Sequence, residues 1–366
     1  MKKIMVAGAG KIGSAIAALL GATGDYAVTV TDASPAALAG IKAGARVQRL
    51  ALDISDPAAL RAALAGQYAV LSAAPFHLTS AIAEAAVAQG VHYLDLTEDV
   101  ASTRRVKELA AGARSALVPQ CGLAPGFVSI VAADLCRRFD SLHSVRMRVG
   151  ALPQFPSNAL NYNLTWSTDG VINEYCEPCE AIVEGVLRQV PPLAEHEEFS
   201  LDGVTYEAFN TSGGLGTLCE TLQGKVTHLN YKTIRYPGYA AIMKVLLNDL
   251  RLRERRHVLK DLLENALPVT LQDVVIVFVT VSGQRDGRLM QETYVHKVYS
   301  QVVDGVLRSA IQVTTASGIC AVLDLLASGK LPARGFVRQE EIALGNFLAN
   351  RFGGAYAEHA AERAAA

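Results

Sequence analysis

The sequence lacks an excess of charge of either sign. Its 366 residues include 34 Lys and Arg against 35 Asp and Glu, so the formal net charge is -1. Proteins that bind nucleic acids or anionic membranes need a basic surface excess, because they neutralise the phosphates of their partner. The balance therefore predicts that neither nucleic acid nor a membrane is a partner of this chain.

Long uninterrupted apolar runs are missing too, although 51% of the residues are hydrophobic and the mean hydropathy is +0.23. A membrane-spanning helix needs about 20 apolar residues, and Gly, Pro or charged residues break the runs well before that length. At the N-terminus, Gly8, Gly10 and Lys11 interrupt the apolar stretch too early for a signal peptide. We therefore expect a first strand there and a cytoplasmic protein.

Cysteine is sparse, and the six cysteines are scattered along the chain. This distribution favours a reducing compartment over a disulfide framework. Cys176 and Cys179 form a C-x-x-C pair, but a zinc site needs a second pair or histidines at a suitable spacing, which the sequence lacks. A redox pair belongs at a helix start in a thioredoxin-like context, which is also missing. The sequence therefore predicts no metal site.

Short apolar segments alternate with helical segments through the first third of the chain. The predicted strands are 3–7, 26–31, 47–52, 68–72, 93–96 and 116–119, and the helices between them are 12–20, 35–43, 56–64, 79–89 and 101–113. This alternation is typical of an α/β fold with a doubly wound parallel sheet, the Rossmann arrangement.

The pattern changes after about residue 125. Strands are predicted at 144–152, 272–283 and 289–303, with a hairpin-like turn at 284–287, and helices at about 237–264. These elements are typical of an α+β domain with an antiparallel sheet. A last apolar helix near 315–327 is expected to return to the first domain, and the tail from Ala355 is expected to fray.

The pattern G-x-G-x-x-G occurs at residues 8–13, between the first predicted strand and helix. In that context it predicts a dinucleotide site, with glycines for the tight turn, the close approach of pyrophosphate and helix packing. The helix N-terminus adds free N–H groups for the phosphates. The alternative is a glycine-rich turn that binds no nucleotide.

The second strand ends at Asp32, about 20 residues after the glycines. A carboxylate there accepts hydrogen bonds from the ribose hydroxyls and repels a 2′-phosphate, and no Arg follows it, so we predict NAD in preference to NADP. Other candidates lie where the third and fourth strands end, on the edge at which such sheets bind ligands. The predicted cofactor-binding residues are Gly8, Gly10, Lys11, Ile12, Gly13, Asp32, Asp53, Ile54, Ala73, Ala74 and Pro75.

Four further strings carry a family resemblance. They are CGLAPG at 121–126, NLTWS at 163–167, NTSGGLGTL at 210–218 and YKTIRYPG at 231–238. Together they resemble the saccharopine dehydrogenase-like family, most closely its lysine 6-dehydrogenase branch, from Lys3 to about Leu331. The combination is specific to the family and less specific to the reaction, because the members share one scaffold across several amines.

The resemblance implies three segments. These are a Rossmann NAD-binding domain at 1–125, an inserted α+β substrate-binding and dimerisation domain at 126–314, and C-terminal helices at 315–366 that return to the Rossmann domain. It also implies hydride transfer between a nicotinamide and a carbon that bears nitrogen. Lysine 6-dehydrogenases oxidise the ε-amine carbon of L-lysine to an imine, which hydrolyses to 2-aminoadipate 6-semialdehyde and ammonia. Relatives commonly form homodimers through the inserted domain.

The α-carboxylate of an amino-acid substrate needs a cation or a cluster of N–H groups. Arg235 is the candidate, mainly from the family resemblance, because its planar fork suits bidentate binding. The alternative is an Arg in a surface ion pair. Further candidate substrate-binding residues, which can add hydroxyl and backbone donors or wall the pocket, are Thr211, Ser212, Gly213, Gly214 and Trp166. The alternatives are a Gly-Gly turn with a structural role and a tryptophan that belongs to the hydrophobic core.

Hydride leaves only from a carbon whose amine is neutral, so the site also needs a proton acceptor. Lys232 is one candidate, if burial beside Arg235 disfavours its charged form, although residues three apart in a strand point to opposite faces. Asp95 is the other, at the ligand edge of the fifth strand, with a buried helix cap as its alternative. His77 is a weaker candidate that more simply lines a loop.

The leading hypothesis is thus NAD-dependent oxidation of the ε-amine of L-lysine. A saccharopine dehydrogenase or another opine or imine reductase is the alternative on the same scaffold, but saccharopine has more carboxylates and needs more than one basic clamp. A non-catalytic NAD-binding sensor is the alternative from a different class.

Overall fold

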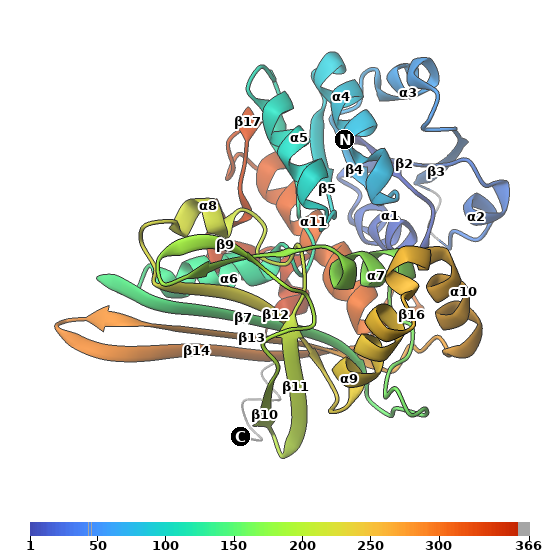
Figure 1. The fold of residues 1–366 in the computed structure, drawn as a ribbon. Helices are drawn as coiled ribbons and strands as arrows, with labels where there is room; N and C mark the ends of the chain where they lie inside the picture. Colours follow the sequence, from blue (N-terminus) through green and yellow to red (C-terminus); the bar gives the residue numbers. More distant parts are fainter. Residues whose placement is uncertain (43, 45, 358–366) are drawn as a thin grey trace. The chain divides into compact units, whose positions relative to one another are not determined.

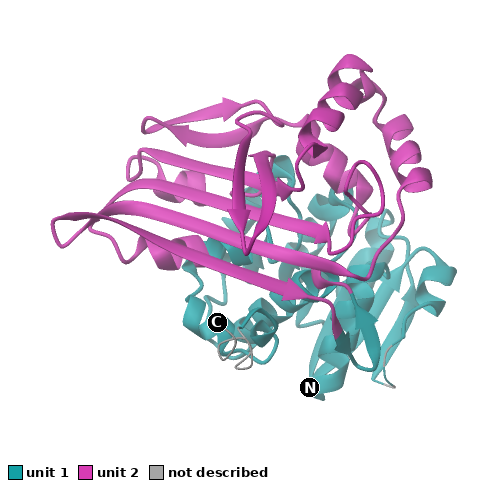
Figure 2. Ribbon diagram, turned by 90° about the horizontal axis from the view of Figure 1, so that it is seen from below, with its two compact units in different colours: residues 1–130, 302–308, 312–366 teal, residues 131–301, 309–311 magenta. Residues whose placement is uncertain are grey.

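The computed structural model describes residues 1–42, 44 and 46–357. The chain forms two compact units (Figure 2). Unit 1 contains residues 1–130, 302–308 and 312 onward, and unit 2 contains residues 131–301 and 309–311. Unit 1 is therefore assembled from both ends of the chain. The inserted segment expected from the sequence, 126–314, differs from this division at both ends, and residues 302–308 inside it belong to unit 1.

Unit 1 is built on a seven-stranded sheet with the order β17-β6-β5-β4-β1-β2-β3, in which every strand pairing is parallel (Figure 1). The strands are β1 (Lys2–Ala7), β2 (Tyr26–Asp32), β3 (Val47–Ala51), β4 (Ala69–Ser72), β5 (His92–Asp95), β6 (Ala116–Val118) and β17 (Gly335–Phe336). The strand order reverses between β1 and β4, and ligands bind beyond the carboxyl ends of the strands at such a point. The predicted Rossmann arrangement is confirmed.

The helices of the first third begin where the sequence supplies caps. Ser34 accepts a hydrogen bond from the N–H of Ala37, and Asp56 accepts two, from Ala58 and Ala59. The helices are α1 (Lys11–Thr23), α2 (Pro35–Ala39), α3 (Pro57–Leu64), α4 (Thr79–Gln89) and α5 (Val100–Ala110), with a short 3-10 turn η1 (Phe76–Leu78). The helix predicted at 35–43 ends earlier, at Ala39. Its expected last residue and the tail from residue 358 lie outside the described residues.

Unit 2 is built on an eight-stranded sheet. Six strands follow the order β10-β11-β12-β7-β13-β14, and β8 pairs with β12 and with β9. The strands are β7 (Ser141–Pro153), β8 (Cys179–Val183), β9 (Val186–Val190), β10 (Glu197–Leu201), β11 (Val204–Asn210), β12 (His228–Arg235), β13 (Asp273–Arg285) and β14 (Arg288–Tyr299). β12 runs parallel to β7, so the predicted antiparallel sheet is in fact mixed, with one parallel pair among antiparallel ones. The reason is the long connection between these two strands, which lets the second one return in the same direction.

The other elements of unit 2 lie between and after these strands. The helices are α7 (Thr168–Cys176), α8 (Leu218–Leu222), α9 (Tyr239–Lys244), η2 (Val245–Asp249), η3 (Leu252–Arg255) and α10 (Arg256–Ala266). β13 and β14 join through Asp286 and Gly287, whose φ angles are 52° and 72°. Positive φ at both central residues is typical of a tight two-residue hairpin, which confirms the turn predicted at 284–287.

The remaining segments belong to unit 1 or contain residues of both units. They are α6 (Phe127–Cys136), the two-stranded sheet of β15 (Gln301–Val303) and β16 (Val306–Arg308), α11 (Ala310–Ala327), η4 (Gln339–Glu341), α12 (Leu344–Leu348) and η5 (Gly353–Tyr356). α11 begins before the predicted residue 315 because Asp273 accepts hydrogen bonds from the N–H groups of Ala310 (2.5 Å) and Ile311 (3.1 Å). Burial raises the pKa of Asp273, and these hydrogen bonds oppose that rise.

With this earlier start, α11 has 18 residues with a mean hydropathy of 1.6, enough to cross a membrane by length and composition. Gly318 and Asp324 nevertheless interrupt its apolar run, as expected from the sequence. Of its residues 83% are buried in the structure. A core helix passes the same length test, so α11 is weak evidence for a membrane span.

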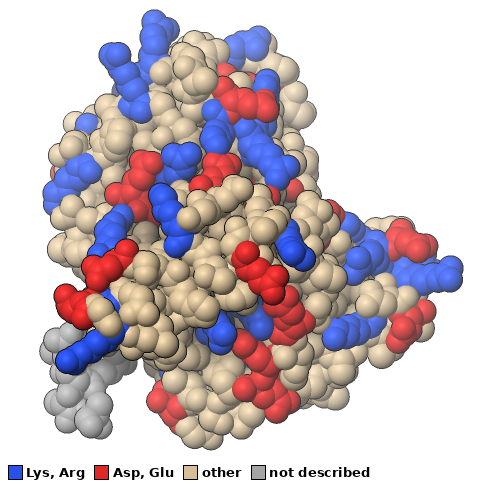
Figure 3. All heavy atoms as spheres, turned by 60° about the vertical axis from the view of Figure 1, so that its left-hand side comes forward, with Lys and Arg blue, Asp and Glu red and all other residues tan. Residues whose placement is uncertain are grey.

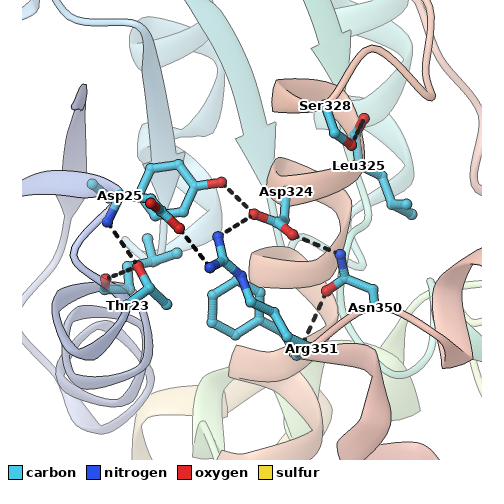
Figure 4. Close-up of polar contacts among 10 residues, drawn as sticks. Thr23, Asp25, Asp324, Leu325, Ser328, Asn350 and Arg351 are labelled. Atoms are coloured by element: carbon cyan, nitrogen blue, oxygen red, sulfur yellow. Dashed lines mark hydrogen bonds and ion pairs between the residues drawn. The ribbon is translucent and has the colours of Figure 1, made fainter.

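A polar network ties the C-terminal part of unit 1 to its N-terminal strands (Figure 4). Asp324 of α11 accepts hydrogen bonds from the Tyr26 hydroxyl (2.6 Å), Arg351 (2.6 Å) and the Asn350 amide (2.8 Å). Arg351 also donates to Asp25, at 2.6 Å. These hydrogen bonds lower the pKa of Asp324 against the opposing effect of burial. The network therefore joins both ends of the described chain.

Candidate functional site

The glycine-rich loop at residues 8–13 connects β1 to α1 at the carboxyl edge of the unit 1 sheet. Gly8 has a φ of 107°, and a Cβ there would lie 2.6 Å from the carbonyl oxygen of Ala73. A Cβ on Gly13 would lie 1.9 Å from the carbonyl oxygen of Gly8. Both positions therefore require glycine for packing. A Cβ on Gly10 would meet nothing within 4 Å, so the backbone there borders open space, as the close approach of a pyrophosphate requires.

The N-terminus of α1 offers unpaired donors beside this space. The first hydrogen bond from within the helix runs from the N–H of Ser14 to the carbonyl oxygen of Gly10, at 2.9 Å. The N–H groups of Lys11, Ile12 and Gly13 precede that bond, so they have no acceptor within the helix. The positive end of the helix dipole adds to their attraction for an anion. The loop and helix therefore fit a dinucleotide phosphate group.

Asp32 lies at the end of β2 beside the loop. Its Oδ2 accepts a hydrogen bond from the N–H of Ala9, and its Oδ1 accepts one from the N–H of Ser34, both at 2.8 Å. A carboxylate has about four acceptor sites, so two bonds fix its orientation and leave capacity for ribose hydroxyls. The position predicted for ribose recognition is thus adjacent to the glycine loop.

The other predicted cofactor contacts differ in accessibility. Ala73 and Ala74 are half-buried and Pro75 is exposed after β4, as is His77. Asp53 is exposed, and hydrogen bonds from the hydroxyl and N–H of Ser55 lower the pKa of its carboxyl. The Ile54 side chain is 7% exposed and belongs to the hydrophobic core of unit 1. Its side chain therefore serves the core.

Asp95 ends β5 and is 1% exposed. It accepts hydrogen bonds from the Tyr93 hydroxyl (2.9 Å) and from the N–H groups of Thr97 (3.1 Å) and Gln120 (2.8 Å). Burial raises the pKa of Asp95 to about 6, although these hydrogen bonds lower it. Asp95 caps no helix, because the N-cap of α5 is Asp99. It instead joins the segment after β5 to the segment after β6.

Glu98, three residues after Asp95, is a titratable group that the sequence reasoning missed. Its side chain is partly exposed. Burial, together with the charges of Asp99 and Asp95, raises the pKa of Glu98 to about 7. A carboxyl that titrates near neutral pH at the ligand edge of the sheet is suited to accept a proton. No sequence pattern marks it, because the shift depends on its surroundings in the fold.

Arg235 ends β12 in unit 2 and is 2% exposed. Its Nη2 donates to the Tyr175 hydroxyl at 3.0 Å, and its Nη1 donates to the carbonyl oxygen of Ile234 at 2.8 Å. The guanidinium lies 4.9 Å from the ring centroid of Tyr162 and 5.4 Å from that of Tyr239. The alternative of a surface ion pair is therefore wrong, because tyrosines surround this cation.

One donor of Arg235 is left over. Within the described part of the chain, its Nε is buried without a hydrogen-bond partner. The carboxylate of Glu174, which is 6% exposed, favours the charged form of Arg235 electrostatically. The sequence reasoning missed Glu174 and the three tyrosines. They come from three separate segments, so only the fold brings them together.

Lys232 lies on the opposite face of β12 from Arg235. In the pairing with β11, Arg235 is opposite Glu207, whereas Lys232 is opposite Asn210, and neighbouring residues of a strand alternate between faces. The Lys232 ammonium donates to the carbonyl oxygen of Glu195 at 2.6 Å and pairs with the Glu197 carboxylate at 3.3 Å. Lys232 is therefore not buried beside Arg235, and the premise for its role as proton acceptor is wrong.

The segment 211–214 packs on the unit 2 sheet. The Thr211 and Thr233 hydroxyls lie 2.7 Å apart. The Ser212 hydroxyl and N–H both donate to carbonyl oxygens, each at 3.0 Å. Gly213 has a φ of 86°, and a Cβ on Gly214 would lie 2.2 Å from the Tyr231 ring. These contacts explain why glycine is required at both positions without any substrate, so a substrate role for the segment stays a prediction.

Trp166 and the C-x-x-C pair also lie in unit 2. Trp166 is half-buried and packs against the hydrophobic cluster that contains Tyr162, Tyr175 and Tyr239. Cys176 ends α7 and Cys179 begins β8, and both are buried free thiols. Among the described residues, no group of three or more His, Cys, Asp and Glu side chains could hold a metal ion.

Two family models match this chain over adjacent segments. The model described as saccharopine dehydrogenase NADP binding domain matches residues 4–118, and the one described as saccharopine dehydrogenase C-terminal domain matches residues 122–351. The first match covers the glycine loop and Asp32, and the second covers Arg235 and its tyrosines. Together they span nearly all of the described chain.

Solved structures share the fold. The saccharopine dehydrogenase (L-Glu forming) from Saccharomyces cerevisiae superposes with a TM-score of 0.77 at 16% identity, over 95% of this chain and 97% of that chain. The homospermidine synthase from Legionella pneumophila, solved with NAD, has a TM-score of 0.66 at 12% identity, over 97% and 89%. With the two family models, these findings show that the chain belongs to the saccharopine dehydrogenase family of NAD(P)-binding oxidoreductases.

Proposed function

We propose that the protein is an NAD-dependent L-lysine 6-dehydrogenase. It oxidises the ε-amine carbon of L-lysine to an imine, which water hydrolyses to 2-aminoadipate 6-semialdehyde and ammonia. NAD supplies the hydride acceptor. The observation that carries the proposal is Arg235, a buried guanidinium whose Nε has no partner within the described residues. A substrate carboxylate would supply the missing acceptor, because a buried donor without a partner is costly.

The number of available cations favours a substrate with one carboxylate. Lys232, the second basic clamp considered from the sequence, is paired with Glu197 on the other face of β12. A saccharopine or opine dehydrogenase remains the second candidate, because Arg253 also lies near the tyrosines. Its Nη2 lies 3.5 Å from the carbonyl oxygen of Tyr175, and its Nε is buried without a partner in the described chain.

The proton that leaves the ε-ammonium group requires an acceptor. We assign it to the pair of carboxyls after β5, Asp95 and Glu98, whose pKa values are raised to about 6 and about 7. Both groups take up protons near neutral pH, as a general base must. Glu98 is the more accessible of the two, because Asp95 is almost fully buried.

The activity test uses purified protein with NAD and a panel of amines. We expect NADH absorbance to grow with L-lysine and ammonia to be released. An increase in NADH absorbance with saccharopine and none with lysine would instead establish the second candidate. NAD binding without turnover on any amino acid or opine would support a non-catalytic sensor.

The preference for NAD rests on Asp32, which the N–H groups of Ala9 and Ser34 hold in place. We expect Asp32→Ala to weaken NAD binding and to relax discrimination against NADP, because ribose acceptors and a repelling charge are both lost. Dissociation constants for the two dinucleotides check this, with Glu108→Ala on the exposed surface of α5 as control. Unchanged affinity for NAD in Asp32→Ala would contradict the ribose assignment.

We also propose a cytoplasmic homodimer that associates through unit 2. One observation supports the dimer. β14 is an edge strand with exposed Leu289 and Met290, and such edges are available for pairing. We propose separately that nucleic acid is not a partner, because Lys and Arg are interspersed with Asp and Glu over the face shown in Figure 3, which gives a polyanion no continuous basic surface there. Light scattering after gel filtration tests the dimer, and a monomeric mass would refute it.

A further inference from the structure

Arg308, at the end of β16, is a buried cation that the proposed reaction does not yet use. It is 7% exposed, and its Nη2 donates to the Ser14 hydroxyl at 3.2 Å. Ser14 is the fourth residue of α1 and follows Gly13 directly. Ser14 and Arg308 are far apart in the sequence, but both belong to unit 1 and contact each other there. The guanidinium therefore lies against the first turn of the helix that begins at the glycine loop.

The guanidinium of Arg308 is poorly satisfied. Of its five N–H donors, Nε is buried without a hydrogen-bond partner among the residues that the structure describes. No carboxylate within the described ranges forms an ion pair with it. Burial lowers the pKa of Arg308, and Asp304 in the preceding turn only partly offsets this. A buried guanidinium without an anion is unfavourable, so an anionic ligand at this place would stabilise it.

The surroundings of Arg308 select the kind of anion. The N–H groups of Lys11, Ile12 and Gly13 have no acceptor in the helix, and the space beside Gly10 is open. Both features fit a phosphate group at the N-terminus of α1. A guanidinium matches the geometry of phosphate oxygens with two parallel donors. A carboxylate would use the fork equally well, but it would leave several of the backbone donors without an acceptor.

We propose that Arg308 binds the pyrophosphate of the dinucleotide and that the Ser14 hydroxyl positions its guanidinium. This inference rests on the proposed function, because it assumes that NAD binds at the glycine loop. It adds a side-chain cation to a site whose other donors belong to the backbone. β16 thereby contributes to the cofactor site, although it lies almost 300 residues after the glycine pattern.

The test compares ligands that differ in their phosphates. Dissociation constants for NADH, ADP-ribose and adenosine are measured for the wild type, Arg308→Gln and Ser14→Ala. We expect Arg308→Gln to bind NADH and ADP-ribose about tenfold more weakly, as for loss of a charge-assisted hydrogen bond, and adenosine equally well. We expect a smaller loss in Ser14→Ala. Arg105→Gln, on the exposed surface of α5, is the matched control and retains wild-type constants.

The possible outcomes are distinguishable. NADH and ADP-ribose constants within twofold of the wild type in Arg308→Gln would overturn the assignment of Arg308 and leave the proposed function standing. A wild type that binds none of the three ligands would overturn both. If Arg308→Gln does not fold, Arg308→Lys replaces it. A selective loss for the phosphate-containing ligands then supports the proposal, and unchanged binding refutes it.

Discussion

At the scale of single residues, burial gives Arg235 and Asp95 their chemical character. Arg235 stays charged among tyrosine rings, whose faces attract a cation. Asp95 is held by three donors and is kept from water, so its neutral form is favoured more than in solution. Charge at both positions therefore depends on neighbours that come from other segments of the chain.

Substitution of Arg235 separates substrate binding from cofactor binding. We expect Arg235→Lys to raise KM for L-lysine about tenfold or more, because the bidentate fork is lost, and to leave the dissociation constant for NAD unchanged. Steady-state kinetics and NADH titration check this. Arg256→Gln, which removes an exposed ion pair with Glu177 in the same unit, is the control. Equal changes in KM in both variants would contradict the assignment.

Asp95 makes stability depend on pH in a defined direction. Its pKa is raised from 3.8 to about 6 in the folded protein, so the folded state holds a proton that the unfolded state releases between these values. Raising the pH through this window therefore destabilises the folded state, by up to about 3 kcal/mol. Urea unfolding from pH 4 to 7 should show wild type losing stability relative to Asp95→Asn. A difference in the free energy of unfolding between the two proteins that stays constant, or that changes in the opposite direction, would refute this.

At the scale of elements, the glycine loop and α1 form one packing unit with β1 and β4. Gly13 contacts the backbone of Gly8, whereas Gly10 borders open space. We expect Gly13→Ala to lower the free energy of unfolding by about 1–3 kcal/mol, as overpacking does, and to impair NAD binding. Gly10→Ala should keep wild-type stability and lose NAD affinity alone. Denaturant titrations and NADH binding check this, and equal stability in the two variants would contradict it.

The strands and helices of the first third of the chain could be predicted from the sequence because they carry local signals, whereas β17 and α12 were not predicted. The helix predicted at 79–89 has those bounds in the structure, and Ser34 and Asp56 cap helices as their types suggest. Unit 2 was harder. β9 is almost wholly exposed and β12 is buried on both faces while it carries Lys232 and Arg235. β9 (VLRQV) lacks the period-2 pattern that marks a half-buried strand. β12 (HLNYKTIR) alternates, but its polar residues from Lys232 onward are buried, which the sequence pattern does not predict.

The candidate site likewise has a part that the sequence predicts and a part that only the fold brings together. The glycine loop and Asp32 are neighbours along the chain and form a known pattern, so the sequence predicts them. The tyrosines around Arg235 come from the segment after β7, from α7 and from α9, and no spacing rule relates them. The position of Lys232 depends on strand register, because a shift of one residue moves a side chain to the other face.

At the scale of the whole molecule, unit 1 depends on contacts between the two ends of the chain. Asp324 collects three hydrogen bonds and is only 18% exposed at its side chain (Figure 4). We expect Asp324→Asn to lower the free energy of unfolding by about 1–3 kcal/mol, because the buried Tyr26 hydroxyl and the Arg351 guanidinium then lose a charged acceptor. Thermal unfolding checks this against Glu341→Gln, which removes an exposed ion pair. Equal melting temperatures would contradict the prediction.

The link between Arg351 and Asp25 also bears on the order in which the two units can fold. These two residues are 326 positions apart, and α11 and β17 are translated after all the strands of the unit 2 sheet. On the ribosome, β1 to β6 emerge first, yet they lack α11 and the edge strand β17 until residues 310–336 have been made. Domains generally fold in the order in which they emerge. Here the strands of the unit 2 sheet have all emerged before those of the unit 1 sheet, so we expect unit 1 to complete its sheet only after α11 and β17 have been made.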